Sequence, residues 1–276
     1  MQQVLKTMLE NVRAKTPLVH NITNYVTVND VANVLLAAGG SPIMSDDADD
    51  VEDITSICGG LNINIGTLNK NTIPSMFLAG KKANELGHIV LLDPVGAGAS
   101  RLRTDTANRL MQEVRFDAVR GNISEIKTLC TGSGSTKGVD ADAVDAVTEA
   151  NLDDGVQLVK TFAQRAGCIV AVTGAIDLVS DGERCWCIRN GRAEMSRITG
   201  TGCQLSALTT AFLVANPEHK LEAAAAAVCM MGLAGEIGWA NMQPGDGNST
   251  YRNRIIDAIF NMTGDALEKG AKYELR

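Results

Sequence analysis

The sequence predicts an α/β fold, a three-layer αβα sandwich in which helices cover both faces of a mostly parallel sheet. Short, continuous apolar runs recur along the chain and each stops at a polar residue, which is typical of strands buried on both faces. Helix-like segments separate these runs, and the alternation indicates βαβ units with parallel strands.

Four of the apolar runs are expected to form parallel strands, at residues 61–65, 89–92, 116–119 and 169–172, with helices that include 71–86 and 152–166. Polar residues stand where three of these strands end, namely Asp93, Arg120, Asn122 and Thr173. In parallel sheets, ligands bind beyond the carboxyl ends of the strands. The sequence therefore predicts a ligand site at this edge of the sheet.

Residues 178–198 follow a different pattern, because turn signals interrupt short apolar stretches. Ser180-Asp181-Gly182 and Asn190-Gly191 supply the positive φ angles that hairpin turns need, so antiparallel edge strands are expected there. Two helices follow, at 203–215 and 221–241, and the second is apolar nearly all round, as a buried helix is. No repeat, linker or shift in composition divides the chain, so residues 1–276 are expected to form one domain without a separate lid.

The composition argues against several classes of protein. A net charge of -7 and a pI near 5.1 disfavour a nucleic-acid-binding protein, and an aromatic content of 4% leaves few surfaces for base stacking. No signal peptide is visible, and the most apolar stretch, 221–231, is shorter than the ~20 residues that cross a bilayer. The seven cysteines fit no zinc spacing, and all except Cys203 are expected to be reduced structural thiols of a cytoplasmic protein.

A glycine-rich loop, Thr199-Gly200-Thr201-Gly202, precedes a helix that is expected to begin at Cys203. Glycines let the backbone approach an anion closely, and the N–H groups and dipole of a helix N-terminus supply partial positive charge. Such a loop would stabilise charge on a phosphoryl group during its transfer. The alternative is an ordinary glycine-rich turn before a helix.

Two familiar nucleotide-binding motifs are absent. Residues 131–137, Thr-Gly-Ser-Gly-Ser-Thr-Lys, imitate a P-loop but have the wrong spacing, so a surface loop is expected there. Gly96 and Gly98 are followed by Arg101, where a dinucleotide-binding motif would place its third glycine. A dinucleotide-dependent oxidoreductase is therefore disfavoured.

Two carboxylates, Asp93 and Glu125, form a candidate Mg²⁺ site. A carboxylate pair at the open edge of the sheet can hold the ion directly or through water, as ATP sites require. For Glu125 there is an alternative, because Asn122-Ile123-Ser124-Glu125 is close to a capping-box pattern. The acidic run at 46–50 is expected to lie at a solvated helix N-terminus instead of binding metal.

Arg120 and His20 are further candidates. The forked guanidinium of Arg120 could reach a triphosphate, and its alternative is a surface ion pair. No second histidine lies at metal-ligand spacing from His20, which favours a structural imidazole with satisfied hydrogen bonds.

Six segments, in the expected order over essentially the whole chain, resemble the hydroxyethylthiazole kinase family of the ribokinase-like superfamily. They are 17–24 (PLVHNITN), 37–44 (AAGGSPIM), 64–67 (NIGT), 93–96 (DPVG), 120–125 (RGNISE) and 199–203 (TGTGC). Each segment alone would be weak, whereas the ordered set is specific.

The resemblance implies ATP-dependent phosphorylation of the hydroxyethyl arm of 4-methyl-5-(2-hydroxyethyl)thiazole in thiamin salvage. It assigns ATP to Arg120 and Thr173, the thiazole to Met44 and Gly200, and Mg²⁺ to Asp93 and Glu125. We add Asn122 to the ATP set and Asn24 to the thiazole set, and leave open whether Asn64 or His20 contacts the substrate. The resemblance also implies a homotrimer whose sites lie at subunit boundaries.

Cys203 departs from the wider superfamily, which usually places an aspartate base at this position, whereas the thiazole-kinase branch has cysteine. A free thiol has a pKa near ~8.5, which a helix N-terminus is expected to lower. Phosphoryl transfer through a loose transition state needs little early deprotonation of the alcohol. We therefore expect Cys203 to be a modest base, and the backbone of Gly200 to Gly202 to supply most of the catalysis together with Thr201.

Three other functions stay open at this point. A related ribokinase-like enzyme would act on a hydroxymethylpyrimidine or on pyridoxal. A hydrolase or transferase would use Cys203 as a covalent nucleophile, for which His20 is the plausible base among three histidines. A nucleotide-binding regulator would lack catalysis, and the acidic pair and loop glycines argue against it.

Overall fold

The computed structural model describes residues 3–132 and 146–276, so residues 133–137 of the P-loop-like segment lie outside it. Its strands are β1 (Leu18–Ile22), β2 (Ser41–Met44), β3 (Gly60–Asn64), β4 (Ile89–Asp93), β5 (Ala118–Asn122), β6 (Ile169–Thr173), β7 (Asp177–Ser180), β8 (Cys185–Ile188) and β9 (Tyr273–Leu275). They form one sheet in the order β2-β1-β3-β4-β5-β6-β7-β8-β9. Neighbours from β2 to β6 pair in parallel and those from β6 to β9 pair antiparallel, which confirms the predicted mixed sheet.

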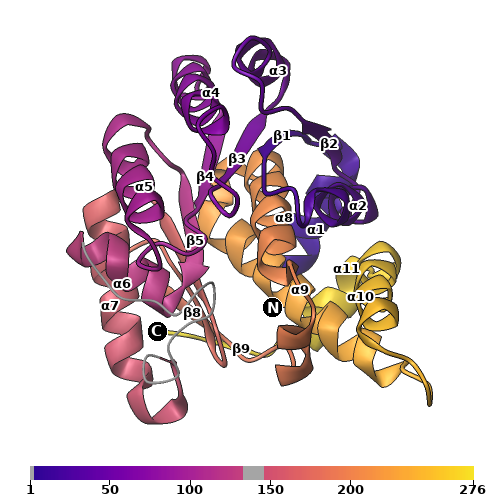
Figure 1. Ribbon diagram of the computed structural model, residues 1–276. Coiled ribbons are helices and arrows are strands. Elements are labelled where there is room, and N and C mark those ends of the chain that lie inside the picture. The colour runs from indigo at the N-terminus through magenta and orange to yellow at the C-terminus, as the bar shows by residue number, and fades with distance from the viewer. Residues whose placement is uncertain (1–2, 133–145) are drawn as a thin grey trace.

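The helices are α1 (Val4–Lys15), α2 (Val28–Ala38), α3 (Val51–Ile57), α4 (Thr72–Leu86), α5 (Arg101–Glu113), α6 (Ile123–Thr131), α7 (Leu152–Ala166), α8 (Thr201–Ala215), α9 (Lys220–Ala240), α10 (Asn248–Asn261) and α11 (Gly264–Gly270). Figure 1 shows α4 to α7 along one side of the sheet and α8 and α9 on the other. The predicted three-layer αβα arrangement is confirmed.

The continuous apolar run of β4 shows why this sequence folds into three layers. Val90 and Leu92 pack into the core beneath α4 to α7, whereas Leu91 between them packs into the core beneath α8 and α9. Successive side chains of a strand point to opposite faces, so a strand with a core on each face needs apolar residues at every position.

Two predicted boundaries, the end of β5 and the start of α8, are wrong by two or three residues. β5 was expected at 116–119 but runs through Asn122, because Arg120 and Asn122 keep their backbone pairing with Ala171 and Thr173 of β6. Polar side chains do not end a ladder whose hydrogen bonds come from the backbone. α8 begins at Thr201 and not at Cys203, which places the second glycine of the loop inside the first helical turn.

The predicted series of hairpins in 178–198 is only partly correct. β7 and β8 form a hairpin, with Gly182 at φ 100° in its turn. After β8, however, the chain enters a short 3-10 helix at 193–197, and the next neighbour of β8 is β9. The aromatic contact between Trp186 and Tyr273, with ring centroids 4.3 Å apart, joins these two strands.

The helix around 221–231 is longer than its most apolar stretch. Residues 217–240 form a helical segment that is long and apolar enough to cross a membrane by length and composition, with a mean hydropathy of 1.4. However, 78% of that window is buried inside the fold, as in the core helix of a globular protein. The acidic run at 46–50 is exposed and directly precedes α3, as predicted. That the chain is one domain stays a prediction.

Candidate active site

The N-terminus of α8 explains why its loop contains two glycines. Gly200 has φ 87°, a left-handed conformation that side chains disfavour, and a Cβ there would collide with Thr27. A Cβ on Gly202 would lie 2.5 Å from Nη1 of Arg120. The first hydrogen bond of the helix runs from the Gln204 N–H to the Gly200 carbonyl, so the N–H groups of the first turn precede the helical ladder and can bind an anion.

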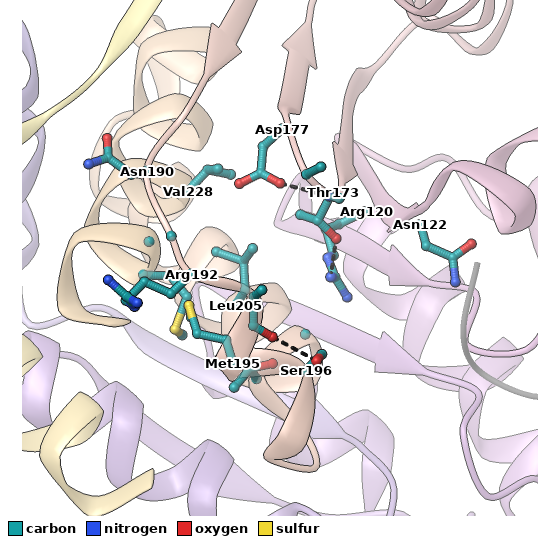
Figure 2. Close-up of a pocket in the computed structure, with 18 residues that line it drawn as sticks. Arg120, Asn122, Thr173, Asp177, Asn190, Arg192, Met195, Ser196, Leu205 and Val228 are labelled. Carbon is teal, nitrogen blue, oxygen red and sulfur yellow. Dashed lines mark hydrogen bonds between the residues drawn. The ribbon is translucent and has the colours of Figure 1, made fainter. Parts of the chain in front are cut away.

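A cavity of about 720 Å³ lies against this helix N-terminus. The ends of β5 and β6, the first turn of α8, the loop at 190–196 and the face of α9 line it. Its lining includes five of the predicted residues, namely Arg120, Asn122, Thr173, Thr201 and Gly202, and Figure 2 shows it with several of them labelled. The structure therefore brings the predicted nucleotide-binding residues together around one cavity.

Arg120, near the end of β5, is one of the residues that line this cavity. Its Nη2 donates to Oγ1 of Thr173, and its Nη1 lies 3.8 Å from Oδ1 of Asp93. The side chain is only 11% exposed, so the pair with Asp93 is not a surface ion pair. Gly202 lets the guanidinium approach the helix, and a fixed cation at a helix N-terminus attracts a phosphate.

Asp93 is a fully buried carboxylate at the end of β4. Its Oδ2 accepts hydrogen bonds from Nδ2 of Asn64 at 2.6 Å and from Oγ of Ser206 at 2.8 Å. Its Oδ1 is buried and, among the described residues, has no hydrogen-bond partner. Burial raises the pKa of Asp93, while Arg120 and the two donors oppose that rise.

Glu125 forms the capping box that the sequence offered as its alternative role. Its Oε2 accepts from the N–H of Asn122 at 2.8 Å, and the side chain of Asn122 accepts from the N–H of Glu125 at 2.9 Å. Its Oε1 accepts from the N–H of Gly96 at 2.8 Å. Burial and then the charge of Asp93 raise the pKa of Glu125 to about 7.

Three residues predicted to lie near the substrate alcohol, Asn24, Met44 and Cys203, are absent from the lining of the cavity. The thiol of Cys203 is 3.1 Å from Nδ2 of Asn24, which donates to it. Met44, at the end of β2, packs against the small apolar cluster that contains Cys203. Asn64, whose role was left open, accepts from Nδ2 of Asn24 at 3.1 Å and so joins this group to Asp93.

The predicted lowering of the Cys203 pKa by its helix N-terminus is wrong. Burial raises the pKa of Cys203, the nearby Asp93 raises it further, and Arg120 and Asn24 only partly oppose this. His20 is fully buried and its two ring nitrogens contact Oγ1 of Thr55 and the Ser45 carbonyl, each at 2.9 Å. The structural role of His20 is confirmed, and it does not activate Cys203 as a nucleophile.

Asp177 is a residue of the cavity that the sequence analysis did not identify. Its Oδ1 accepts from the N–H of Gly174 at 2.8 Å, and burial raises its pKa to about 7. The signal was present in Thr173-Gly174-Ala175-Ile176-Asp177, where an aspartate follows a strand end and can close a turn.

Asp177 and Glu125 make stability depend on pH. Between the ordinary value of 3.8 and about 7, folded Asp177 holds a proton that the unfolded chain releases, so the free energy of unfolding falls as pH rises. Glu125 acts in the same direction from 4.5 to about 7. We expect Asp177→Asn to reduce this pH slope by up to one proton in urea unfolding measured across the window. An unchanged slope would contradict the shift.

Comparison with known proteins places the chain in a family. Residues 9–265 match the model of the hydroxyethylthiazole kinase family. A hydroxyethylthiazole kinase of Clostridium acetobutylicum is 57% identical over 271 residues, covering 98% of this chain and 99% of the relative. The structure of a hydroxyethylthiazole kinase protein from Pyrococcus horikoshii OT3 is 33% identical, with a TM-score of 0.88 and full coverage of both chains.

A pyridoxal kinase of Staphylococcus aureus in complex with ADP shares the fold, with 15% identity, a TM-score of 0.57, and coverage of 77% of this chain and 85% of that one. That likeness shows the architecture alone, whereas the family model and the C. acetobutylicum relative match along nearly the whole chain. The chain belongs to the hydroxyethylthiazole kinase family.

Proposed function

We propose that this protein transfers the γ-phosphoryl group of ATP to the hydroxyethyl alcohol of 4-methyl-5-(2-hydroxyethyl)thiazole, a step of thiamin salvage. One observation carries the proposal. The N-terminus of α8 separates a cavity large enough for a nucleotide from a buried group that contains Cys203 and Asn24. A phosphoryl group passing between the two sides would meet the N–H groups of Gly200 to Gly202.

The cavity suits ATP because cationic, polar and apolar side chains line it together. Arg120 and Thr173 would bind phosphate oxygens near the helix N-terminus, and Asn122 lies at the same edge. Leu205 and Val228 also line the cavity and would contact the nucleoside. Catalysis would then depend on positioning and on stabilising the charge of the transferred group.

The acidic residues fit a Mg²⁺ ion, which would supply charge neutralisation for the phosphates. Oδ1 of Asp93, which has no hydrogen-bond partner among the described residues and lies 3.8 Å from Arg120, would be the ligand, directly or through water. Each oxygen of Glu125 accepts one backbone N–H and keeps a second lone pair, so Glu125 could contribute through water. Among the described residues no cluster of three or more metal-binding side chains occurs, and Mg²⁺ in ATP sites typically needs only one or two carboxylates.

On the other side of α8, Asn24, Met44 and the backbone of Gly200 would hold the thiazole. Cys203 would lie beside the alcohol, with its thiol fixed by the amide of Asn24. Because the pKa of this thiol is raised, Cys203 would be protonated at neutral pH and would position the alcohol more than deprotonate it.

The proposed activity is tested by incubating the protein with Mg-ATP and a panel of alcohols: the thiazole, pyridoxal and a hydroxymethylpyrimidine. We expect ADP and a phosphorylated product with the thiazole at a kcat/KM well above that for the other two. A preference for pyridoxal or the pyrimidine would replace the proposed substrate. ADP formation that is independent of every alcohol would exclude a specific kinase.

Replacing Cys203 tests its role. For Cys203→Ala we expect kcat to fall by less than ~100-fold, the lower end of what a positioned general base supplies. Cys203→Asp should stay active, because an aspartate fits beside the alcohol in the wider superfamily. Steady-state kinetics with the thiazole and Mg-ATP would check both, with Asp93→Asn as the reference for a severe loss. A Cys203→Ala variant as inactive as Asp93→Asn would overturn the modest role.

We also propose a homotrimer with each site completed at a subunit boundary. Tyr25 and Val26, 77% and 57% exposed, follow directly after Asn24, so apolar surface lies at the thiazole side. Exposed apolar residues beside a site are typical of an interface. Light scattering after gel filtration should give three copies of the 29.2 kDa chain, and a monomer mass would contradict the proposal.

The cytoplasm is the compartment that we propose. All seven cysteines, which lie in the described part of the chain, are free thiols, as a reducing compartment would keep them. Cell fractionation would test it, and recovery of the native protein in a membrane fraction would contradict it.

A further inference from the structure

One acidic side chain, Asp177, lines the cavity, and the phosphates of a nucleotide would repel it. Asp177 is the one carboxylic acid among the lining residues, all of which belong to the described part of the chain. A carboxylate beside a triphosphate costs energy through like-charge repulsion. Asp177 must therefore face a part of the ligand that donates hydrogen bonds and carries no negative charge.

The carboxylate keeps one oxygen for such a ligand. Oδ1 accepts from the N–H of Gly174, whereas Oδ2 has no hydrogen-bond partner among the described residues. Figure 2 shows Asp177 beside Thr173, with the second oxygen on the side away from it. A carboxylate oxygen that lines a cavity can accept from a ligand hydroxyl or amine.

The polar groups of the loop opposite are already committed to the protein. The amide of Asn190 donates to Glu236 and to the Gly270 carbonyl, and its oxygen accepts from the N–H of Lys272. The hydroxyl of Ser196 donates to the Ala193 carbonyl at 2.7 Å. These side chains shape the cavity, which leaves Asp177 as an acceptor available to the nucleoside.

The position of Asp177 selects the sugar as its partner. The carboxylate is bonded to the residue that follows Thr173, and Thr173 is bonded to Arg120, the proposed phosphate ligand. The part of a nucleotide that adjoins its phosphates is the ribose. Val228, on α9, lies beside Asp177 in Figure 2, and its apolar side chain can pack against the nucleoside next to that hydrogen bond.

We propose that Asp177 recognises the ribose of ATP, with its free carboxylate oxygen accepting a hydrogen bond from the 2′- or 3′-hydroxyl. This inference rests on the proposed binding of ATP in the cavity. Above pH 7, where Asp177 is ionised, a hydroxyl bound to it forms a charge-assisted hydrogen bond, so its removal leaves the acceptor unpaired. Asp177 is thus a specificity-determining residue for the sugar.

The test measures binding without any alcohol substrate, by calorimetry of the full chain with Mg-ATP, Mg-2′-deoxy-ATP and Mg-3′-deoxy-ATP. For the wild type we expect at least one deoxynucleotide to bind about ten- to a hundredfold more weakly than ATP, as a lost hydrogen bond to a charged group predicts. In Asp177→Ala this ratio should fall to about one. Deoxynucleotides that bind the wild type as well as ATP does would overturn the proposal.

A purely structural Asp177, acting only as a cap for Gly174, would weaken all three nucleotides equally. An unchanged ratio in Asp177→Ala would therefore overturn ribose recognition. Asp181→Ala is the matched control, because Asp181 also accepts turn N–H groups, from Glu183 and Arg184, but is absent from the cavity lining; its ratio should equal the wild-type ratio.

A second variant and a second nucleotide cover the cases in which Asp177→Ala does not fold or Asp177 binds the base. Asp177→Asn keeps an oxygen for Gly174 and removes the charge, so if the alanine variant does not fold, the asparagine variant should still show a reduced ratio. Mg-ITP reports on the base, and a variant that alters ATP against ITP but not the sugar ratio would reassign Asp177 to the base amine. A chain that binds ATP with the expected ratio but phosphorylates no thiazole would sustain this inference while the proposed function fails.

Discussion

The arrangement of the site follows from the burial of one charge, the carboxylate of Asp93. In the core that carboxylate needs compensation, and three elements supply it: Asn64 from β3, Arg120 from β5 and Ser206 from α8. Each of these partners holds a second contact. Asn64 accepts from Asn24, and Arg120 donates to Thr173, so fixing the carboxylate also fixes the group around Cys203 and the edge of the cavity.

The need to neutralise Asp93 also explains the glycine in the first turn of α8. Arg120 can neutralise Asp93 and reach the cavity only if the helix leaves room for its guanidinium, and Gly202 leaves that room. The cation and the helix dipole then act on the same ligand atoms. Cys203, one residue further, is buried beside a carboxylate, which makes its thiolate unfavourable. For the proposed reaction, this favours electrostatic stabilisation over base catalysis.

Local patterns predicted the features that depend on local physics. Continuous apolar runs predicted four of the parallel strands, β3 to β6, but not β1 and β2, whose runs contain polar residues or proline. The strand ends located Arg120 and Thr173. The contribution of β9 was not foreseen, because a three-residue strand has almost no pattern and its partner β8 lies far away in sequence. Long-range packing likewise decided the pKa of Cys203, and the cavity role of Asp177 required knowing which wall its strand faces. Such properties depend on residues that are close in space but far apart in the sequence.

Hydrogen bonds from the C-terminal segment anchor the loop at 189–191, and these bonds can form only late in translation. The Arg189 N–H donates to the Lys272 carbonyl, and Asn190 bonds to Gly270 and Lys272, 80 and 82 positions later in the chain. At roughly 5–20 residues per second, a ribosome needs about 4–16 s to make that stretch. During this interval the growing chain has β5 and β6 but lacks the contacts that anchor the loop at 189–191. A ligand of the cavity, such as the proposed ATP, would therefore stabilise the chain only near the end of translation.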